Sequence, residues 1–390
     1  MIKAATGSIV RLESAMIIGG TLNTAGTGVV EASGGSALDG SGSTVHNQGE
    51  LKVIDGDSLA ATGVIDNTGA IALAGTSSGS ALVVSGNLTL QGGGSLSLAD
   101  VPGSLITGPT FSDTLSNVDN TIAGDGQIGG GQMTLVNQSK GFIEEPGATG
   151  LTIDTGSTAI INAGEIRALG SGGILIQSAV TNSGVIAADG AGALTITAKV
   201  KNTGLLEANG GTLIDYEAVN GKGSAAIAAG SLEFMSSFNQ DVAFTGSSGT
   251  LELAKSQAYT ATIIGFSQAG GTFLDLADIK FTGKAGQASF VDNGSHTGGV
   301  LTVTDGIHTA HINLVGDYHT STFVVANDGN GKVLVHDPAA TDATLTAPGA
   351  HPFIAAMASF GAHPGGPAQL ANDTHFARPA MLSVPRMAMA

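Results

Sequence analysis

Hydrophobic residues return along the chain at alternating positions. After Asn162, Ile166 and Ala168 alternate with charged neighbours, and Ile174 and Ile176 follow eight residues after them. An alternation of period two is typical of a strand with one buried face. Equivalent apolar residues follow other asparagines four, six, twelve and fourteen residues on, and in several copies eighteen residues on. The pattern predicts units of two strands and a short third strand.

Each unit is marked by the motif Asn-x-Gly, followed by any residue and then by Ile or Leu. The predicted asparagine ladder is Asn47, Asn67, Asn137, Asn162, Asn182 and Asn202, and the corner glycines are Gly49, Gly69, Gly164, Gly184 and Gly204. Three steps between successive ladder asparagines are twenty residues long, whereas the step from Asn137 to Asn162 is twenty-five. We therefore expect one coil with a five-residue insertion around Pro146.

A constant period of twenty residues predicts an all-β fold, a parallel β-helix in which stacked coils share one core. Strands of successive coils would pair about 4.7–4.9 Å apart. Asparagine tolerates a left-handed corner, and its amide can donate to the next coil while accepting from the previous one. Weaker steps of twenty lead to Asn87 and from Asn117. A set of antiparallel hairpins is the alternative, but it does not explain the constant spacing.

The pattern changes twice along the chain. Residues 1–255 carry the repeats and predict about a dozen coils, without an obvious polar cap at the start, so we expect further coils before Met1. Residues 256–338 bring larger apolar residues and predict a β-rich module that caps the C-terminal end of the solenoid. Residues 339–390 are rich in Ala, Pro and His and predict a flexible tail.

Composition narrows the classes of function. The net charge is −17 with only 14 Lys and Arg, which argues against a nucleic-acid partner. The chain has no cysteine, so disulfides and thiolate metal sites are excluded. No window of about twenty apolar residues predicts a membrane span. We expect no cofactor and no metal.

Particular stretches resemble a known group of proteins. The run from Leu115 to Gly129, the run from Thr181 to Asp189 and the closing unit from Leu301 to Pro338 resemble large bacterial β-strand-repeat surface proteins, which are autotransporter-passenger-like or adhesin-like. The resemblance covers roughly residues 45–338. It implies a β-helical stalk outside the cell and no catalytic residues.

Some residues invite a chemical interpretation. Glu144 and Glu145 precede Pro146 in the expected insertion and predict a solvated loop, although a pair of carboxylates could serve glycoside hydrolysis. His308 and His311 are three residues apart, which on a strand places them on opposite faces and disfavours joint metal ligation. The run of residues 328–331, Asp-Gly-Asn-Gly, predicts a hairpin turn rather than a calcium loop.

The sequence therefore predicts a scaffold, not an enzyme. The expected function is that of a secreted or cell-surface, adhesin-like rod that presents loops. Its expected partners are glycans or host and cell-surface proteins, and we expect a monomer or part of a longer chain. A carbohydrate-active β-helix of the polysaccharide lyase or hydrolase kind, and a passive passenger fragment of a larger secreted protein, are the alternatives.

Overall fold

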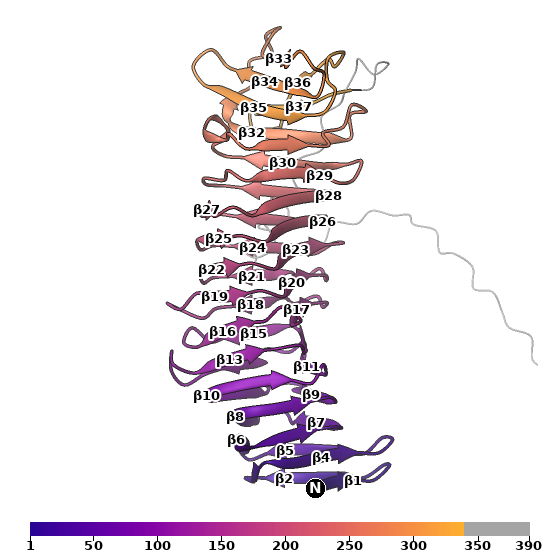
Figure 1. Ribbon diagram of the computed structural model, residues 1–390. Coiled ribbons are helices and arrows are strands. Elements are labelled where there is room, and N and C mark those ends of the chain that lie inside the picture. Colours follow the sequence, from indigo (N-terminus) through magenta and orange to yellow (C-terminus); the bar gives the residue numbers. More distant parts are fainter. Residues whose placement is uncertain (339–390) are drawn as a thin grey trace, which may run out of the picture. The chain divides into compact units, whose positions relative to one another are not determined.

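The computed structural model describes residues 1–338, which form an all-β solenoid of about 13 parallel stacked coils (Figure 1). The predicted fold class is thereby confirmed. The one helical element within these residues is a 3-10 turn, η1 (Ser256–Ala258). None of the helical structure in residues 1–338 is long and apolar enough to cross a membrane. The expected tail, residues 339–390, lies outside the described residues.

Three ladders of strands, which we call the first, second and third walls, surround the core. The first wall contains β2 (Ile9–Glu13), β5 (Val29–Ser33), β7 (Glu50–Val53), β9 (Ala70–Leu73), β11 (Ser95–Leu98), β14 (Thr121–Gly124), β17 (Phe142–Glu145), β20 (Glu165–Ala168), β23 (Val185–Asp189), β26 (Leu205–Asp215), β28 (Ser224–Phe234), β29 (Asp241–Phe244), β31 (Thr262–Ile264) and β35 (Thr309–Val315). The second contains β3 (Met16–Ile18), β6 (Ser36–Asn47), β8 (Ser58–Asn67), β10 (Ala81–Gln91), β12 (Leu105–Thr107), β15 (Gly126–Gly129), β18 (Leu151–Ile153), β21 (Ile174–Ile176), β24 (Ala193–Ile196), β30 (Gly249–Leu253) and β32 (Thr272–Lys280). The third contains β1 (Ile2–Ala4), β4 (Gly20–Thr24), β13 (Thr114–Asn117), β16 (Thr134–Asn137), β19 (Ile160–Asn162), β22 (Val180–Asn182), β25 (Val200–Asn202) and β27 (Val219–Asn220).

Some strands are long enough to turn a corner and serve two walls. Strands β6, β8 and β10 run through the second and third walls, and β26 and β28 run through the first and second. In these coils one continuous strand therefore joins two of the three walls.

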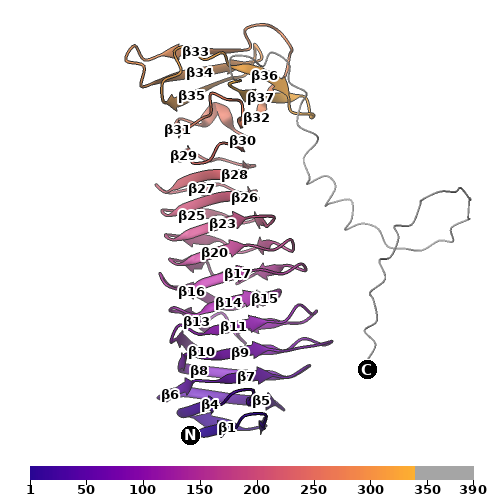
Figure 2. The ribbon, with the colours of Figure 1, turned by 90° about the vertical axis from the view of Figure 1, so that its right-hand side faces the viewer.

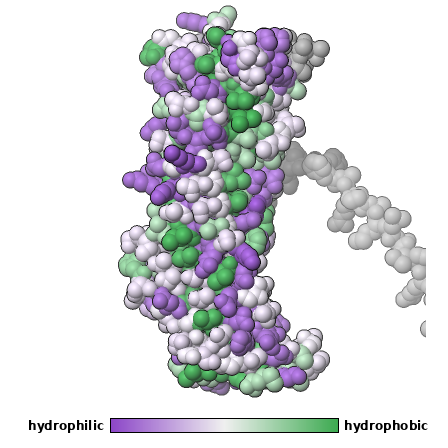
Figure 3. All heavy atoms as spheres, viewed as in Figure 1, coloured by the Kyte–Doolittle hydropathy of each residue, from purple (hydrophilic) through white to green (hydrophobic). Residues whose placement is uncertain are grey.

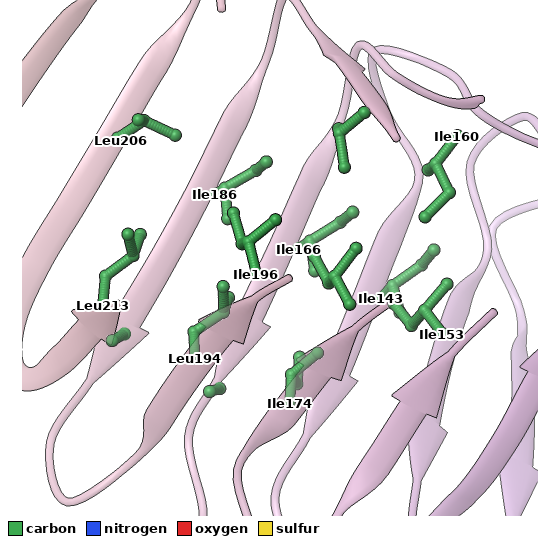
Figure 4. Close-up of a cluster of buried hydrophobic side chains, with 14 of the residues drawn as sticks. Ile143, Ile153, Ile160, Ile166, Ile174, Ile186, Leu194, Ile196, Leu206 and Leu213 are labelled. Carbon is green, nitrogen blue, oxygen red and sulfur yellow. The ribbon is translucent and has the colours of Figure 1, made fainter. Parts of the chain in front are cut away.

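Aliphatic side chains stack in register inside the walls. Ile143 is opposite Ile166, Ile166 is opposite Ile186, and Ile186 is opposite Leu206, so these four buried residues form one row of the core (Figure 4). Burying one such side chain contributes about 1.5–3 kcal/mol. Because each row lies against the rows of the other walls, the coils share a single core.

The extra five residues between Asn137 and Asn162 are not at Pro146. Ile143 pairs with Ile166, and Ile153 pairs with Ile176, so the stretch that contains Pro146 has the same length in both coils. Two of the extra residues lie in the corner before β17, and three lie between β18 and β19. The predicted single insertion was wrong because spacing between asparagines cannot show where within a coil the extra residues lie.

The strand pairing changes near the C-terminal end of the described residues. Parallel pairing continues beyond residue 255, through β30 with β32 and β31 with β35. Antiparallel pairs then join β33 (Ala288–Asp292) to β34 (Gly298–Thr304), β34 to β35, β32 to β37 (Lys332–His336), and β36 (Val324–Asn327) to β37. These antiparallel strands cover the last coil (Figure 2).

At the opposite end, the first coil has no such cover among residues 1–338. Strands β1, β2 and β3 pair only with β4, β5 and β6 of the next coil. Met1, Ile9, Met16 and Ile18 are exposed there. Figure 3 shows hydrophobic residues gathered at this end of the stack.

Candidate functional site

The asparagine ladder runs along the third wall, inside the corner between this wall and the first. The side-chain amide of Asn137 donates to Oδ1 of Asn162 at 2.9 Å, and the amides of Asn162 and Asn182 donate to Asn182 and Asn202 at 2.8 Å. The same amide of Asn162 also donates to the backbone oxygen of Val185 in the next coil, at 3.0 Å. The ladder therefore links each coil to the next both through side-chain amides and through the backbone at the start of the first-wall strand.

The first part of the ladder begins at Asn47. Its amide donates to Asn67 at 2.7 Å, while its own Oδ1 is buried with no hydrogen-bond partner in residues 1–338. In the preceding coil the equivalent position is Leu22, which has no amide to donate. The series thus starts where a leucine replaces the asparagine.

Glycine interrupts the ladder at two places, and an amide from the following coil fills each gap. After Asn67 the equivalent position is Gly92, and Asn67 donates instead to Asn120 at 2.8 Å. After Asn202 the equivalent position is Gly221, and Asn202 donates instead to Gln240 at 2.8 Å. Both glycines have positive φ, 109° and 105°.

Asn117, Asn120 and Gln240 belong to the ladder but were missing from the predicted set. Asn117 donates to Asn137 at 3.0 Å and accepts from the backbone amide of Asn120 at 3.1 Å. A signal in the sequence would have been glycine in place of asparagine, followed one coil later by a side-chain amide. Asn87, by contrast, is exposed at the register of Thr114, so its step of twenty residues does not place it in the ladder.

The corner glycines have a different role from the one expected. None of Gly49, Gly69, Gly164, Gly184 and Gly204 has a positive φ, and neither do the ladder asparagines. A Cβ at Gly184 would lie 2.0 Å from the carbonyl oxygen of Gly164, and one at Gly204 would lie 2.1 Å from that of Gly184. Glycine is required because successive coils touch at this corner. The expectation of a left-handed asparagine relaxed by glycine was wrong.

Glu144 and Glu145 do not lie in a loop, which corrects the sequence-based expectation. Both belong to β17, where Glu144 faces outward opposite Arg167 and Glu145 is fully buried. Glu145 Oε2 accepts from the backbone amide of Gly173 at 2.8 Å. Alternation along a strand turns one of two neighbouring residues inward, so the pair cannot act together on one substrate.

Burial, together with the adjacent Asp125, raises the pKa of Glu145 to about 7. The pKa of Asp125 is lowered although its burial opposes this, because Glu145 and the backbone amides of Thr149 and Gly150 donate to it. Asp125 is 2% exposed and Glu145 is 0% exposed. Asp125 and Glu145 are therefore neighbouring carboxyl groups that solvent does not reach.

A second set of carboxylates lies on the second wall toward the C-terminal end. Glu233, Glu252 and Asp275 are in register on β28, β30 and β32. Burial, followed by the charge of Glu252, raises the pKa of Asp275 to about 8. Asp215, one coil earlier, is fully buried, and burial raises its pKa to about 7. Asp215 and Asp275 therefore keep their protons to a higher pH than an exposed aspartate does.

The histidines and the predicted turn lie in the C-terminal antiparallel strands. His308 is in the turn before β35, where its Nδ1 lies 2.9 Å from Asp305, and His311 is on β35 beside Thr302. Both are exposed. Residues 328–331 form the expected hairpin turn between β36 and β37, and Asp328 accepts from the backbone amide of Lys332 at 2.8 Å.

A group of loops projects from one side of the first coils. The loops of residues 54–57, 74–80 and 99–104 follow β7, β9 and β11 (Figure 2). Asp55 Oδ1 accepts from the backbone amides of Thr76, Ser77 and Ser78 at 2.7–2.9 Å, and Gly56 donates to the backbone oxygen of Gly79. One loop thus orders the next. We call residues 54–57, 74–80 and 99–104 the loop face.

Comparison with known proteins gave no match to a family model, to a curated protein or to a solved structure.

Proposed function

We propose that the chain is a non-catalytic, adhesin-like scaffold of a bacterial cell surface or of the extracellular space, and that its loop face engages a glycan or a surface protein. The observation that carries the proposal is the order of these loops. Asp55 holds three consecutive amides of the next loop, including that of Ser77. Loops that are ordered before binding lose less conformational entropy when a partner docks.

The chemistry of the loop face suits polar partners. Residues 74–80 read Ala-Gly-Thr-Ser-Ser-Gly-Ser and present hydroxyls and backbone groups with few charged side chains. Small polar side chains of this kind provide adaptable hydrogen bonding at recognition surfaces. A glycan, which offers many hydroxyls, matches this surface better than an apolar ligand does.

The buried carboxylates support a structural role over a catalytic one. Glu145, Asp215 and Asp275 have raised pKa values, as catalytic acids often do, but each is at most 2% exposed. A general acid must come within hydrogen-bond reach of the atom that it protonates. A polysaccharide cannot approach groups that lie inside the stack.

A glycan array probed with the full chain tests the binding part of this proposal. The Asp55→Ala variant releases the loop of residues 74–80, and we expect it to lose binding at least tenfold. Glu13→Ala, an exposed carboxylate on β2 outside the loop face, is the matched control and should bind like the parent. Equal binding of all three chains to a glycan, or binding of the parent to no glycan on the array, would contradict glycan recognition by the loop face.

Surface labelling tests the location. Intact bacteria that express the natural gene are treated with a membrane-impermeant amine reagent, which reacts with exposed lysines such as Lys201. We expect the chain to be labelled before lysis or to be recovered from the medium. Labelling only after lysis would overturn the extracellular location without bearing on the fold.

A further inference from the structure

Two histidines and an aspartate converge in the C-terminal antiparallel strands. His296 lies in the turn between β33 and β34, and Asp317 and His319 lie in the segment after β35. One potential metal-ligand atom from each of the three residues lies within 4.8 Å of those of the other two. All three residues are exposed, so an ion can reach them from solvent.

The strand register brings these segments together. Gly298 at the start of β34 is opposite Val315 at the end of β35. Gly316 then donates to the backbone oxygen of Thr297 at 3.0 Å, which extends the pairing into both loops. As a result, the rings of His296 and His319 lie with their centroids 4.4 Å apart at an angle of 42°. The two imidazoles are neighbours in space although His319 follows His296 by twenty-three positions in the sequence.

A carboxylate lies beside one ring nitrogen of each histidine. His296 Nδ1 is 3.2 Å from Asp292 Oδ1, and His319 Nδ1 is 2.6 Å from Asp317 Oδ1. A carboxylate that accepts from Nδ1 fixes the ring and leaves Nε2 as the basic nitrogen, which is the usual arrangement around metal-binding histidines. Asp317 has a second oxygen that remains for coordination.

The backbone on both sides of the cluster is held by its own hydrogen bonds. Asn293 Oδ1 accepts from the backbone amide of Ser295, and its Nδ2 donates to Thr297 at 2.9 Å. The side chain of Gln268 donates to the backbone oxygen of Asp317. These contacts position the ligands before an ion arrives, which lowers the cost of ordering them.

We propose that His296, Asp317 and His319 form a binding site for a divalent transition-metal ion, with Zn²⁺ as the ion that best fits the donors. Two imidazole nitrogens and one carboxylate oxygen suit zinc, which takes three such ligands and a water. Calcium and magnesium prefer ligand sets made of oxygen alone. The ion would join the turn of residues 292–297 to the segment after β35. This inference does not depend on the proposed scaffold function.

Isothermal titration of the full chain with ZnCl₂ tests the site. Three histidines outside the described residues, His351, His363 and His375, are further potential zinc ligands, so the parent for the titration carries alanine at these positions. We expect about one equivalent of Zn²⁺ to bind to this parent. His296→Ala and His319→Ala should each weaken binding at least tenfold.

His308→Ala is the matched control, because His308 is also exposed and also lies beside a carboxylate, that of Asp305, at 2.9 Å. It should bind Zn²⁺ like the parent. A second readout is thermal: Zn²⁺ should raise the melting temperature of the parent and of His308→Ala but not that of His319→Ala. Absence of binding by the parent, or equal affinity in all four chains, would overturn the proposal. Circular dichroism without metal verifies that each variant is folded.

Discussion

The side-chain amide of Asn67 donates to Asn120 at 2.8 Å, across a separation of fifty-three residues. The coil between them has Gly92 at the equivalent corner, and the amide of the following coil closes the gap. Asn202 and Gln240 repeat the arrangement across Gly221. The ladder is therefore a property of the stack as a whole, and its members need not come from consecutive coils.

Replacement of Asn120 tests this long-range contact. Asn67 also donates to the backbone oxygen of Ser95, so Asn120→Ala leaves one of its two buried N–H groups unpaired. We expect a loss of about 1–3 kcal/mol in the free energy of unfolding. Asn87→Ala is the control, because Asn87 follows Asn67 by twenty residues but is exposed. Its effect should stay within about 0.5 kcal/mol. Denaturant melts that rank the two variants the other way would remove Asn120 from the ladder.

A comparison within the regular coils tests the ladder itself. Asn182→Leu deletes the contacts to Asn162 and to Asn202, and the expected cost is about 1–3 kcal/mol. Asn209→Leu changes an exposed corner residue whose side-chain amide donates to the carboxylate of Asp189, so the melting temperature of this variant should stay close to that of the parent. Equal melting temperatures for the two variants would refute the ladder.

The corner glycines are predicted to be needed because a side chain there would clash with the neighbouring coil, and not because of their backbone angles. In Gly184→Ala the new Cβ would lie 2.0 Å from the backbone oxygen of Gly164, so neighbouring coils must separate. In Gly190→Ala the residue has a left-handed φ of 56°, but the closest atom to its Cβ is 3.9 Å away. We expect Gly184→Ala to lower the melting temperature clearly more than Gly190→Ala. A larger effect of Gly190→Ala would show that the backbone angle, and not the space between coils, determines the cost of replacing a glycine.

The buried carboxylates predict a solenoid that loses stability as the pH rises. The pKa of Asp275 is raised from 3.8 to about 8 in the folded chain, mainly by burial. Between about pH 4 and pH 8 the folded chain therefore holds a proton that the unfolded chain has released, and stability falls over this window. Glu145 and Asp215, with pKa values of about 7, act in the same direction. Chemical denaturation should give a lower free energy of unfolding at pH 8 than at pH 5.

Asp275→Asn tests the assignment of this effect. Asparagine has no proton to lose, so the variant should flatten the decline between pH 5 and pH 8 and be more stable than the parent at pH 8. Glu13→Gln alters an exposed carboxylate on β2 and should leave the slope as it is in the parent. If Asp275→Asn kept the full slope, another group would be responsible.

Much of the fold could be predicted because the period is visible in single residues. Ile166, Ile186 and Leu206 follow their asparagines at the same distance, and they stack in one row. The position of the extra residues before Asn162 could not be predicted, because only the register of the strands between the asparagines reveals it. The spacing of the asparagines at one corner does not show how many residues lie at the other corners of the coil.

The candidate sites were harder to predict, because they too depend on how the strands are paired. Glu145 lies in a strand, and its burial depends on which face of β17 is turned inward. His296 and His319 belong to segments with no shared motif, and they meet only through the antiparallel register of β34 and β35. Contacts across antiparallel strands can be predicted only when the pairing of the strands is known. Contacts between coils can be predicted from the twenty-residue period.

The coils after Asn162 and Asn182 have the same register, so the length of the stack is set by the number of coils. Because Ile166, Ile186 and Leu206 occupy equivalent places, a segment of twenty residues could be removed or duplicated and the flanking walls would still meet in phase. Each such edit would shorten or lengthen the stack by about 4.8 Å. An edit of ten residues would join the first wall to the second. The length of the stack can therefore change only in steps of one whole coil. The number of coils sets the distance between the loop face and the antiparallel strands.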